Sequence, residues 1–479
     1  MRSCRLVLVL ATVCCALVSV ADGFTKADAE AALKKAVTFL REEVSAEGGY
    51  LWRYSADLSR REGEGKADAS MAWVQPPGTP SMGQAFLTAY ECTQDAYYLE
   101  AAVETARALV KGQLASGGWD YRIEFNPERR TRYAYRVAPS NPEGHNTSTL
   151  DDNTTQAALR FLMRVDKALD FKDEAIHEAT LYGIEALLAA QYPIGAWPQR
   201  FTGPPDPDKY PVKKASYPES WPRTFPNKDY RGYYTFNDNT IADAIQVMFD
   251  AFDLYGDERC TRAADKAGDF ILLAQMPDPQ PGWAQQYDPD MHPAWARKFE
   301  PPAVTGGESQ GVMRTLLFLY TKTGDKKYLE PLPRALEYYK KSLLPDGRLA
   351  RFYELETNRP LYFTKTYELT YSSDDMPTHY AFITTSRLDD IEAQYNTLVA
   401  AGAPPEKAAT ETTYKMTDKL AAFAQTVADG LDERGAWVED GSLRYHGDDD
   451  PTRRIIDARN VAGNIVALSE FIAASKAAE

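Results

Sequence analysis

Apolar residues recur at helical spacing along most of this chain, whereas the strict alternation typical of strands is scarce. The periodic segments end at short breaks such as Asp170–Phe171, so neighbouring helices are expected to form antiparallel hairpins. The helical pattern predicts eleven segments: Ala27 to Val44, Met82 to Leu114, Asp152 to Ala168, Lys172 to Gln191, Asn239 to Leu254, Glu258 to Ala274, Ser309 to Thr323, Lys327 to Leu343, Asp389 to Ala401, Ala409 to Ala428 and Ala462 to Ala474.

A glycine-centred turn followed by aromatic and polar residues recurs between the predicted hairpins. It occurs as GGYLWRYS at Gly48, GGWDYRI at Gly117, GAWPQRF at Gly195, GWAQQYD at Gly282, GRLARFYE at Gly347 and GAWVED at Gly435. Repeated hairpins with similar linking loops predict an all-α fold, an α/α toroid whose loops gather at one end around a cleft. An irregular helical solenoid with coincidental aromatic turns is the alternative.

Three long segments without helical periodicity interrupt the pattern: Pro204 to Arg231, Pro277 to Thr305 and Arg348 to Pro377. Loops of this length in a compact domain usually serve a function or move. The chain shows no linker and no second composition regime, so a single domain over residues 22–479 is the simplest interpretation.

The first residues have the pattern of a secretory signal peptide. Arg2 and Arg5 precede an apolar run from Leu6 to Val20, and the triplet Ser19-Val20-Ala21, with small residues at its first and third positions, precedes the expected cleavage point. We therefore expect residues 1–21 to be removed and the mature protein to be secreted or periplasmic, without a membrane anchor. Only Cys92 and Cys260 would remain in the mature chain, so it could form at most one disulfide.

The formal net charge of −15 argues against a nucleic-acid partner, because such partners require a basic surface. Net charge alone does not exclude an acidic substrate, since a local cluster of arginines or a bound cation decides recognition. We expect the protein to be a monomer.

Two similar acidic motifs stand where predicted helices begin. LDDNT contains Asp151, Asp152 and Asn153, and FNDNT contains Asn237 and Asp238. Such residues commonly cap helices, which is one interpretation. The other is that carboxylate and amide oxygens from two neighbouring hairpins share a hard cation such as Ca²⁺.

Arginine recurs in the aromatic loops. The positions are Arg53, Arg122, Arg200, Arg297, Arg351 and Arg359. A single loop arginine is usually solvated or salt-bridged at the surface. Several arginines beside tryptophan and tyrosine instead suit a sugar acid, because guanidinium groups bind carboxylates and aromatic faces stack on sugar rings.

The chain lacks the signatures of several other enzyme classes. Its five histidines form no zinc-binding pair, and neither GxSxG nor a Gly-rich nucleotide-binding loop occurs. Zinc hydrolase, serine esterase and nucleotide-dependent functions are therefore disfavoured.

In order along the chain, GGYLWRYS, DDNTT, GAWPQRF, TFND, GWAQQYD, ARKFEPP, ESQG at Glu308 and RFYELETNRP resemble the pectate lyases of polysaccharide lyase family 10. The resemblance covers about Gly48 to Pro360. It implies an α/α toroid that cleaves polygalacturonate or pectin by Ca²⁺-assisted β-elimination and leaves 4,5-unsaturated products.

The resemblance also implies roles for individual residues. Arg297 would be the catalytic base that takes the C5 proton. The Ca²⁺ ligands would be Asp152 and Asp238, with Asn153 and Asn237 in support. The substrate would be bound by Trp197, Gln199, Arg200, Arg351, Arg359 and Lys365.

Two departures from the family pattern are a lysine, Lys365, where a further arginine is expected, and Ala196 in place of a second glycine. Two other functions remain open. A glycoside hydrolase on the same fold would use Asp152, Asp238 or Glu300 as an acid/base pair and give saturated products. A non-catalytic pectin-binding protein would need Trp197 and the arginines but neither Asp152 nor Arg297.

Overall fold

The computed structural model describes residues 23–403 and 414–477. The predicted signal peptide, residues 1–21, lies outside the described residues. In the described part, no helix has both the length and the apolar character needed to cross a membrane. Cys92 and Cys260 are both buried and both free, so they do not form the disulfide that the sequence left open.

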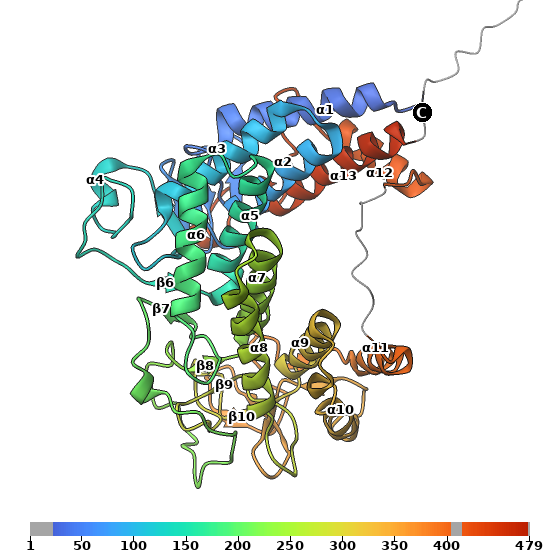
Figure 1. The fold of residues 1–479 in the computed structure, drawn as a ribbon. Coiled ribbons are helices and arrows are strands. Elements are labelled where there is room, and N and C mark those ends of the chain that lie inside the picture. Colours follow the sequence, from blue (N-terminus) through green and yellow to red (C-terminus); the bar gives the residue numbers. More distant parts are fainter. Residues whose placement is uncertain (1–22, 404–413, 478–479) are drawn as a thin grey trace, which may run out of the picture.

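Helices make up the framework (Figure 1). They are α1 (Lys26–Phe39), α2 (Thr79–Thr93), α3 (Ala96–Gly112), α4 (Pro127–Arg130), α5 (Thr154–Ala168), α6 (Glu174–Ala189), α7 (Thr240–Tyr255), α8 (Glu258–Leu273), α9 (Glu308–Thr323), α10 (Leu332–Lys341), α11 (Leu388–Ala401), α12 (Asp418–Asp429) and α13 (Ala458–Lys476). These bounds confirm most of the helices that the periodicity predicted.

Two predicted helices differ from the structure. The segment Met82 to Leu114 is a hairpin rather than one helix, because Gln94 adopts a left-handed conformation (φ 62°) and Asp95 then caps α3. The predicted helix from Ala409 begins only at Asp418, and its first residues up to 413 lie outside the described part.

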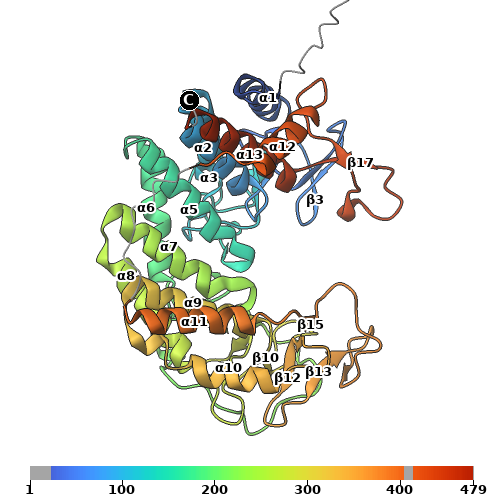
Figure 2. The ribbon, with the colours of Figure 1, turned by 90° about the vertical axis from the view of Figure 1, so that its right-hand side faces the viewer.

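The helices pack as two curved rows, which form an α/α toroid (Figure 2). One row contains α13, α2, α5, α7, α9 and α11, each packed against the next, and the second contains α3, α6 and α8. Hairpins such as α2–α3 and α7–α8 join the rows. Apolar residues of both rows meet in one core, so the predicted fold class is confirmed.

Short strands of two to four residues decorate the loops of the described chain. They are β1 (Arg53–Ser55), β2 (Arg61–Glu62), β3 (Lys66–Ala67), β4 (Met71–Trp73), β5 (Arg122–Glu124), β6 (Ser148–Thr149), β7 (Arg200–Phe201), β8 (Tyr234–Thr235), β9 (Gln286–Tyr287), β10 (Ala303–Thr305), β11 (Leu349–Ala350), β12 (Phe352–Glu354), β13 (Pro360–Phe363), β14 (Leu369–Thr370), β15 (Ile383–Thr384), β16 (Glu439–Asp440) and β17 (Arg454–Asp457). Such short strands leave no room for the alternation that signals a strand in sequence.

Strand pairing ties distant parts of the chain together. β1 pairs antiparallel with β17, in the register Tyr54 to Ile456, so the two ends of the chain share one sheet in the order β16-β17-β1-β2-β3. β10 pairs with β12, which continues to β13 and β14. The C-terminal strand β17 therefore lies beside an N-terminal strand, and α13 packs against α2.

The glycine-aromatic turns pack against helices, and those at Gly117, Gly195 and Gly282 follow the second-row helices α3, α6 and α8. Gly195 has φ +104°, and a side chain there would lie 2.0 Å from the carbonyl oxygen of Lys266 on α8. The tryptophan after each of four turns donates its indole N–H to a carbonyl of the preceding helix, at 2.7–2.9 Å. The pairs are Trp119 with Leu109, Trp197 with Leu187, Trp283 with Ile271, and Trp437 with Val427.

Candidate active site

Two turns of the same backbone shape precede α5 and α7. In the 3₁₀ turns η2 (Asp151–Asn153) and η4 (Asn237–Asn239), two consecutive residues are left-handed: Asp152 and Asn153 in one, Asp238 and Asn239 in the other. The two turns pack against each other. Neither Asn153 nor Asn239 caps the following helix with its side chain, so the capping interpretation of these motifs does not hold.

Non-glycine residues seldom adopt the left-handed region, and Asp and Asn do so most readily. Each turn therefore stores some backbone strain, which in proteins is concentrated at functional sites.

The turns bring three carboxylates together. Oxygen atoms of Asp151, Asp152 and Asp238 lie within 4.8 Å of one another. Burial, then repulsion by Asp151, raises the pKa of Asp152 to about 6. Burial, then repulsion by Asp152 and Asp151, raises the pKa of Asp238 to about 7. Carboxylates this close disfavour one another's ionised form, and a bound cation would favour it.

Two of the carboxylates are held by neutral donors. Tyr121 donates its hydroxyl to Asp151 Oδ2 at 2.6 Å, and Gln75 donates its amide to Asp152 Oδ2 at 2.6 Å. Trp73 in turn donates to Gln75 Oε1 at 3.0 Å. These bonds fix the orientation of the carboxylates without neutralising them.

The third carboxylate is linked to the predicted base through a chain of amides. Asn237 donates to Asp238 Oδ2 and accepts a bond from Gln285 at 2.8 Å. Gln285 also donates to Glu300 Oε1 at 2.7 Å, and Glu300 accepts Arg297 Nη2 at 2.6 Å. Arg297 Nη2 itself lies 4.0 Å from Asp238 Oδ2.

Glu300 controls the charge of Arg297. Burial lowers the pKa of this guanidinium, but its hydrogen bond and ion pair with Glu300 outweigh burial, so the pKa of Arg297 is raised. Burial likewise raises the pKa of Glu300, and Arg297 more than reverses this, so that the pKa of Glu300 is lowered. Glu300 is therefore an ionised partner of Arg297 and not a proton donor.

Two further predicted arginines reach the same group. Arg351 pairs with Glu308 and lies 4.4 Å from the ring centre of Tyr380, whose hydroxyl donates to Glu300. Arg200 Nη2 donates to the Tyr121 hydroxyl at 3.2 Å, and Tyr121 in turn donates to Asp151. Gln199 is buried, and its carbonyl accepts the N–H of Leu150 directly before the first turn.

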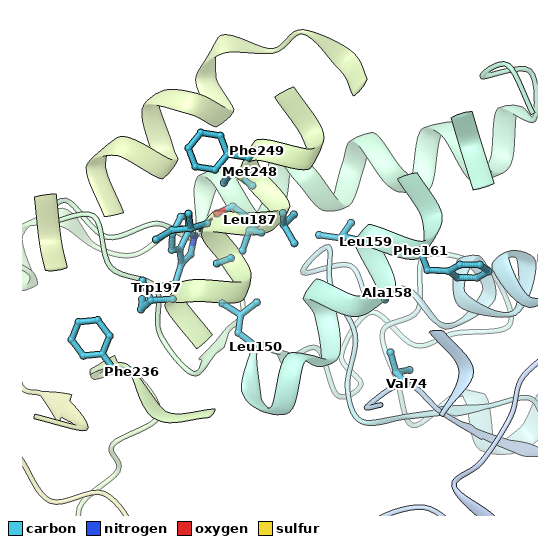
Figure 3. Close-up of a cluster of buried hydrophobic side chains, with 14 of the residues drawn as sticks. Val74, Leu150, Ala158, Leu159, Phe161, Leu187, Trp197, Phe236, Met248 and Phe249 are labelled. Carbon is cyan, nitrogen blue, oxygen red and sulfur yellow. Dashed lines mark hydrogen bonds between the residues drawn. The ribbon is translucent and has the colours of Figure 1, made fainter. Parts of the chain in front are cut away.

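Three residues predicted to bind substrate are placed elsewhere. Trp197 is fully buried in the apolar core (Figure 3), where its indole N–H is bound to Leu187, so it offers no face to a sugar. Arg359 stacks on Tyr371, 3.4 Å from the ring centre. Lys365 forms an exposed ion pair with Asp375 at 3.1 Å. The described contacts of Arg359 and Lys365 do not include the carboxylate group.

Sequence reasoning missed five partners of the site: Gln75, Tyr121, Gln285, Tyr380 and the role of Glu300 as the anchor of Arg297. One signal was available for the glutamines. The tripeptide Trp-x-Gln occurs at Trp73, Trp197 and Trp283, each time placing a buried glutamine two residues after a buried tryptophan. The tyrosines come from separate loops and carry no comparable pattern.

The residues present fit a hard divalent cation. Within the triad, Asp151 Oδ1 is a buried oxygen atom without a partner among the described residues, and Asn153 Oδ1 beside it is another. Carboxylate and amide oxygens are the ligands that Ca²⁺ prefers. Asn237, predicted in a supporting role, donates to Asp238 and accepts a bond from Gln285. Asp151, which was not among the predicted ligands, joins the candidates.

Residues 113–349 match the family model described as pectic acid lyase. This segment, just under half of the chain, is similar to the pectic acid lyases. This confirms the resemblance drawn from the ordered motifs and makes the protein a polysaccharide lyase. The matched segment contains both turns, Arg200, Arg297 and Glu300, whereas Gln75, Arg351 and Tyr380 lie outside it.

Solved structures similar to this chain include two of a family 10 polysaccharide lyase from Cellvibrio cellulosa. One is an aspartate-to-alanine mutant in complex with trigalacturonic acid, at 21% identity over 67% of this chain and 98% of that chain, with a TM-score of 0.45. The other is described only as a family 10 polysaccharide lyase. It is 21% identical over 67% of this chain and 97% of that chain, with a TM-score of 0.45.

A cellobiose 2-epimerase from Bacillus thermoamylovorans is also similar, at 14% identity over 93% of this chain and 98% of that chain, with a TM-score of 0.44. No curated protein matches this chain.

Proposed function

We propose that this protein is an exported pectate lyase that cleaves polygalacturonate by Ca²⁺-assisted β-elimination, with Arg297 as the base. One observation carries the proposal: Arg297 lies 4.0 Å from a carboxylate of the acidic triad, so a cation-binding group and a basic group face the same point. The family match supports the substrate class, since the matched family is that of pectic acid lyases.

The proposed reaction removes the proton on C5 of a galacturonate unit. The electron pair of that C–H bond forms the C4–C5 double bond, the C4–O bond breaks, and the departing oxygen gains a proton. Asp151, Asp152 and Asp238, with Asn153, would hold the Ca²⁺. When bound, the cation would neutralise the substrate carboxylate next to C5 and, as a positive charge close to Arg297, favour the neutral guanidine.

To act as the base, Arg297 must first lose a proton from its guanidinium group. In the described structure Glu300 keeps the guanidinium protonated, so Arg297 can accept a proton only when the loaded site offsets this effect. We therefore expect an alkaline optimum for kcat. A flat profile from mildly acidic to alkaline pH would contradict the assignment of the base.

Arg200 and Arg351 would bind substrate carboxylates. Arg200 and Arg351 each have a buried Nε atom without a described partner, and a uronate carboxylate supplies the acceptor that such an atom needs. Gln199 would hold η2 in place through the hydrogen bond from Leu150 to its carbonyl. Trp197, Arg359 and Lys365 have no part in this proposal, because of their burial or remote pairing.

The deciding experiment uses the mature protein with polygalacturonate, with and without a chelator, and follows unsaturated uronide in the ultraviolet. Absorbance that rises only with added Ca²⁺ supports the proposal. The variant Arg297→Lys should lower kcat by about 10²-fold or more, whereas the matched variant Arg434→Lys, at a surface pair with Asp432, should retain full activity.

Saturated products that form regardless of chelator would favour the glycoside hydrolase instead. The raised pKa values of Asp152 and Asp238 are the observation on its side, because a protonated carboxyl can act as an acid. The ion pair of Glu300 with Arg297 stands against its use as that acid. Binding of pectate without any product would favour the pectin-binding protein.

Export belongs to the proposal because polygalacturonate is a polymer outside the cell and residues 1–21 have the pattern of a signal peptide. Expression of the full chain, followed by N-terminal sequencing of the product outside the cytoplasm, should give a mature chain that begins after Ala21. A product retained in the cytoplasm with Met1 intact would contradict export.

A further inference from the structure

Tyr380 occupies a central place beside the proposed site, although it lies outside the family-matched segment. It belongs to the loop between β14 and β15, and Figure 2 shows β15 at the same end of the molecule as β10 and β12. Its hydroxyl donates to Glu300 Oε1 at 2.9 Å. Burial, then repulsion by Glu300 and Glu308, raises the pKa of Tyr380, so the phenol stays protonated and keeps this bond.

The ring of Tyr380 lies between two arginine–glutamate pairs. Its centre is 4.4 Å from the guanidinium carbon of Arg351 and 5.6 Å from that of Arg297. Arg351 pairs with Glu308, and Arg297 pairs with Glu300. An aromatic face attracts cations, so one ring holds two guanidinium groups that would otherwise repel each other.

Packing holds Tyr380 in place. Its ring centre lies 4.7 Å from that of Phe299 and 5.3 Å from that of Phe382. Phe299 stands between Arg297 and Glu300 in the chain, while Phe382 accepts the N–H of Arg351 with its backbone carbonyl. The same ring is therefore packed against the backbone neighbours of both arginines.

We propose that Tyr380 is a positioning residue that fixes Arg297 and Arg351 at a set separation, so that the base and a carboxylate-binding guanidinium act on one sugar unit together. This inference rests on the proposed lyase function. Catalysis by a positioned base is sensitive to displacements of about 1 Å, and arginine side chains need packing or hydrogen bonds to hold such a position.

Two variants separate the hydroxyl from the ring. Tyr380→Phe removes only the bond to Glu300 and should lower kcat on polygalacturonate by about tenfold with KM unchanged. Tyr380→Leu also removes the aromatic face and should in addition weaken binding of trigalacturonic acid, measured by calorimetry, by about fivefold. Ca²⁺ affinity should stay the same in both variants, because Tyr380 does not contact the three carboxylates.

Tyr255→Phe is the matched control. Tyr255 also donates its hydroxyl to a buried carboxylate, Asp166 Oδ2 at 2.7 Å, but at the far end of α7. A purely structural role for Tyr380 would make both Phe variants lower the melting temperature alike and leave kcat unchanged. A wild-type kcat in Tyr380→Phe would overturn the inference. Wild-type protein that forms no unsaturated product with Ca²⁺ would refute the proposed function itself, and this inference with it.

Discussion

Aspartate occurs at or near the starts of two sets of helices, α3, α6 and α8 on one side and α5 and α7 on the other, but its contacts differ between the two sets. At the starts of α3, α6 and α8, the side chains of Asp95, Asp173 and Asp257 accept a backbone N–H of the first turn. At the starts of α5 and α7, the corresponding acidic turns make no such bond. One set uses aspartate to stabilise a helix, and the other leaves aspartate available to a ligand.

Backbone conformation accounts for the difference. Asp95, Asp173 and Asp257 are extended, which lets the side chain fold back onto the helix. Asp152 and Asp238 are left-handed, with φ of 49° and 48°, and the residue after each is left-handed as well. The same residue type can therefore cap a helix or leave the helix end uncapped, depending on the backbone angles of two consecutive residues.

The largest effect is expected from Asp238→Ala. This change removes a carboxylate from the triad and the neighbour of Arg297, so kcat/KM should fall by at least about 10²-fold. Melting temperature measured without Ca²⁺ should not fall, because the variant relieves repulsion at a buried carboxylate whose pKa is raised. A variant that loses folding and activity together would place Asp238 with the structural aspartates.

Asp151→Asn makes the first turn resemble the second, which has Asn237 at the matching position. Losing one of three carboxylates should weaken Ca²⁺ binding by about tenfold or more in calorimetry. Tyr121→Phe, which removes only the hydrogen bond to Asp151, is the matched variant and should have the smaller effect. Unchanged Ca²⁺ affinity in Asp151→Asn would exclude Asp151 as a ligand.

Stability without metal should depend on pH through the same turns. An unfolded carboxyl titrates near about 4, whereas burial and repulsion raise the pKa of Asp152 to about 6 and that of Asp238 to about 7. The folded chain then binds more protons than the unfolded chain between these values, so the free energy of unfolding falls as pH rises from about 4 to 7.

Melting temperatures of chelator-treated protein should show this loss, and added Ca²⁺ should restore more stability at pH 8 than at pH 5. The double variant Asp152→Asn, Asp238→Asn should have a flatter pH dependence. An equally steep loss in the double variant would assign the effect to other groups.

The smallest effect on activity is expected from Asp95→Ala. Asp95 accepts the N–H of Tyr97 at 2.9 Å, and losing such a cap costs about 1 kcal/mol of stability. Chemical denaturation should detect this loss, while kcat and Ca²⁺ affinity stay at wild-type values. A fall in kcat without a loss of stability would contradict the division between the two sets.

The sequence by itself determined the helical framework, the hairpin repeat and the ordered motifs that indicate a pectate lyase. It could do so because helical periodicity and chain order are local properties. It also named Asp152, Asp238, Arg200, Arg297 and Arg351, which the fold brings into one group.

Only the tertiary structure decided what each residue contacts. Trp197 was predicted to stack on a sugar ring, but it is buried and donates its indole N–H to Leu187 of α6. Asn237 was predicted as a supporting ligand, and in the structure its amide bonds to Asp238 and Gln285. Glu300 and Tyr380 gain their roles from loops that are far apart in sequence. Burial and hydrogen bonding between distant segments set both the charge and the orientation of a side chain, and no local pattern records them.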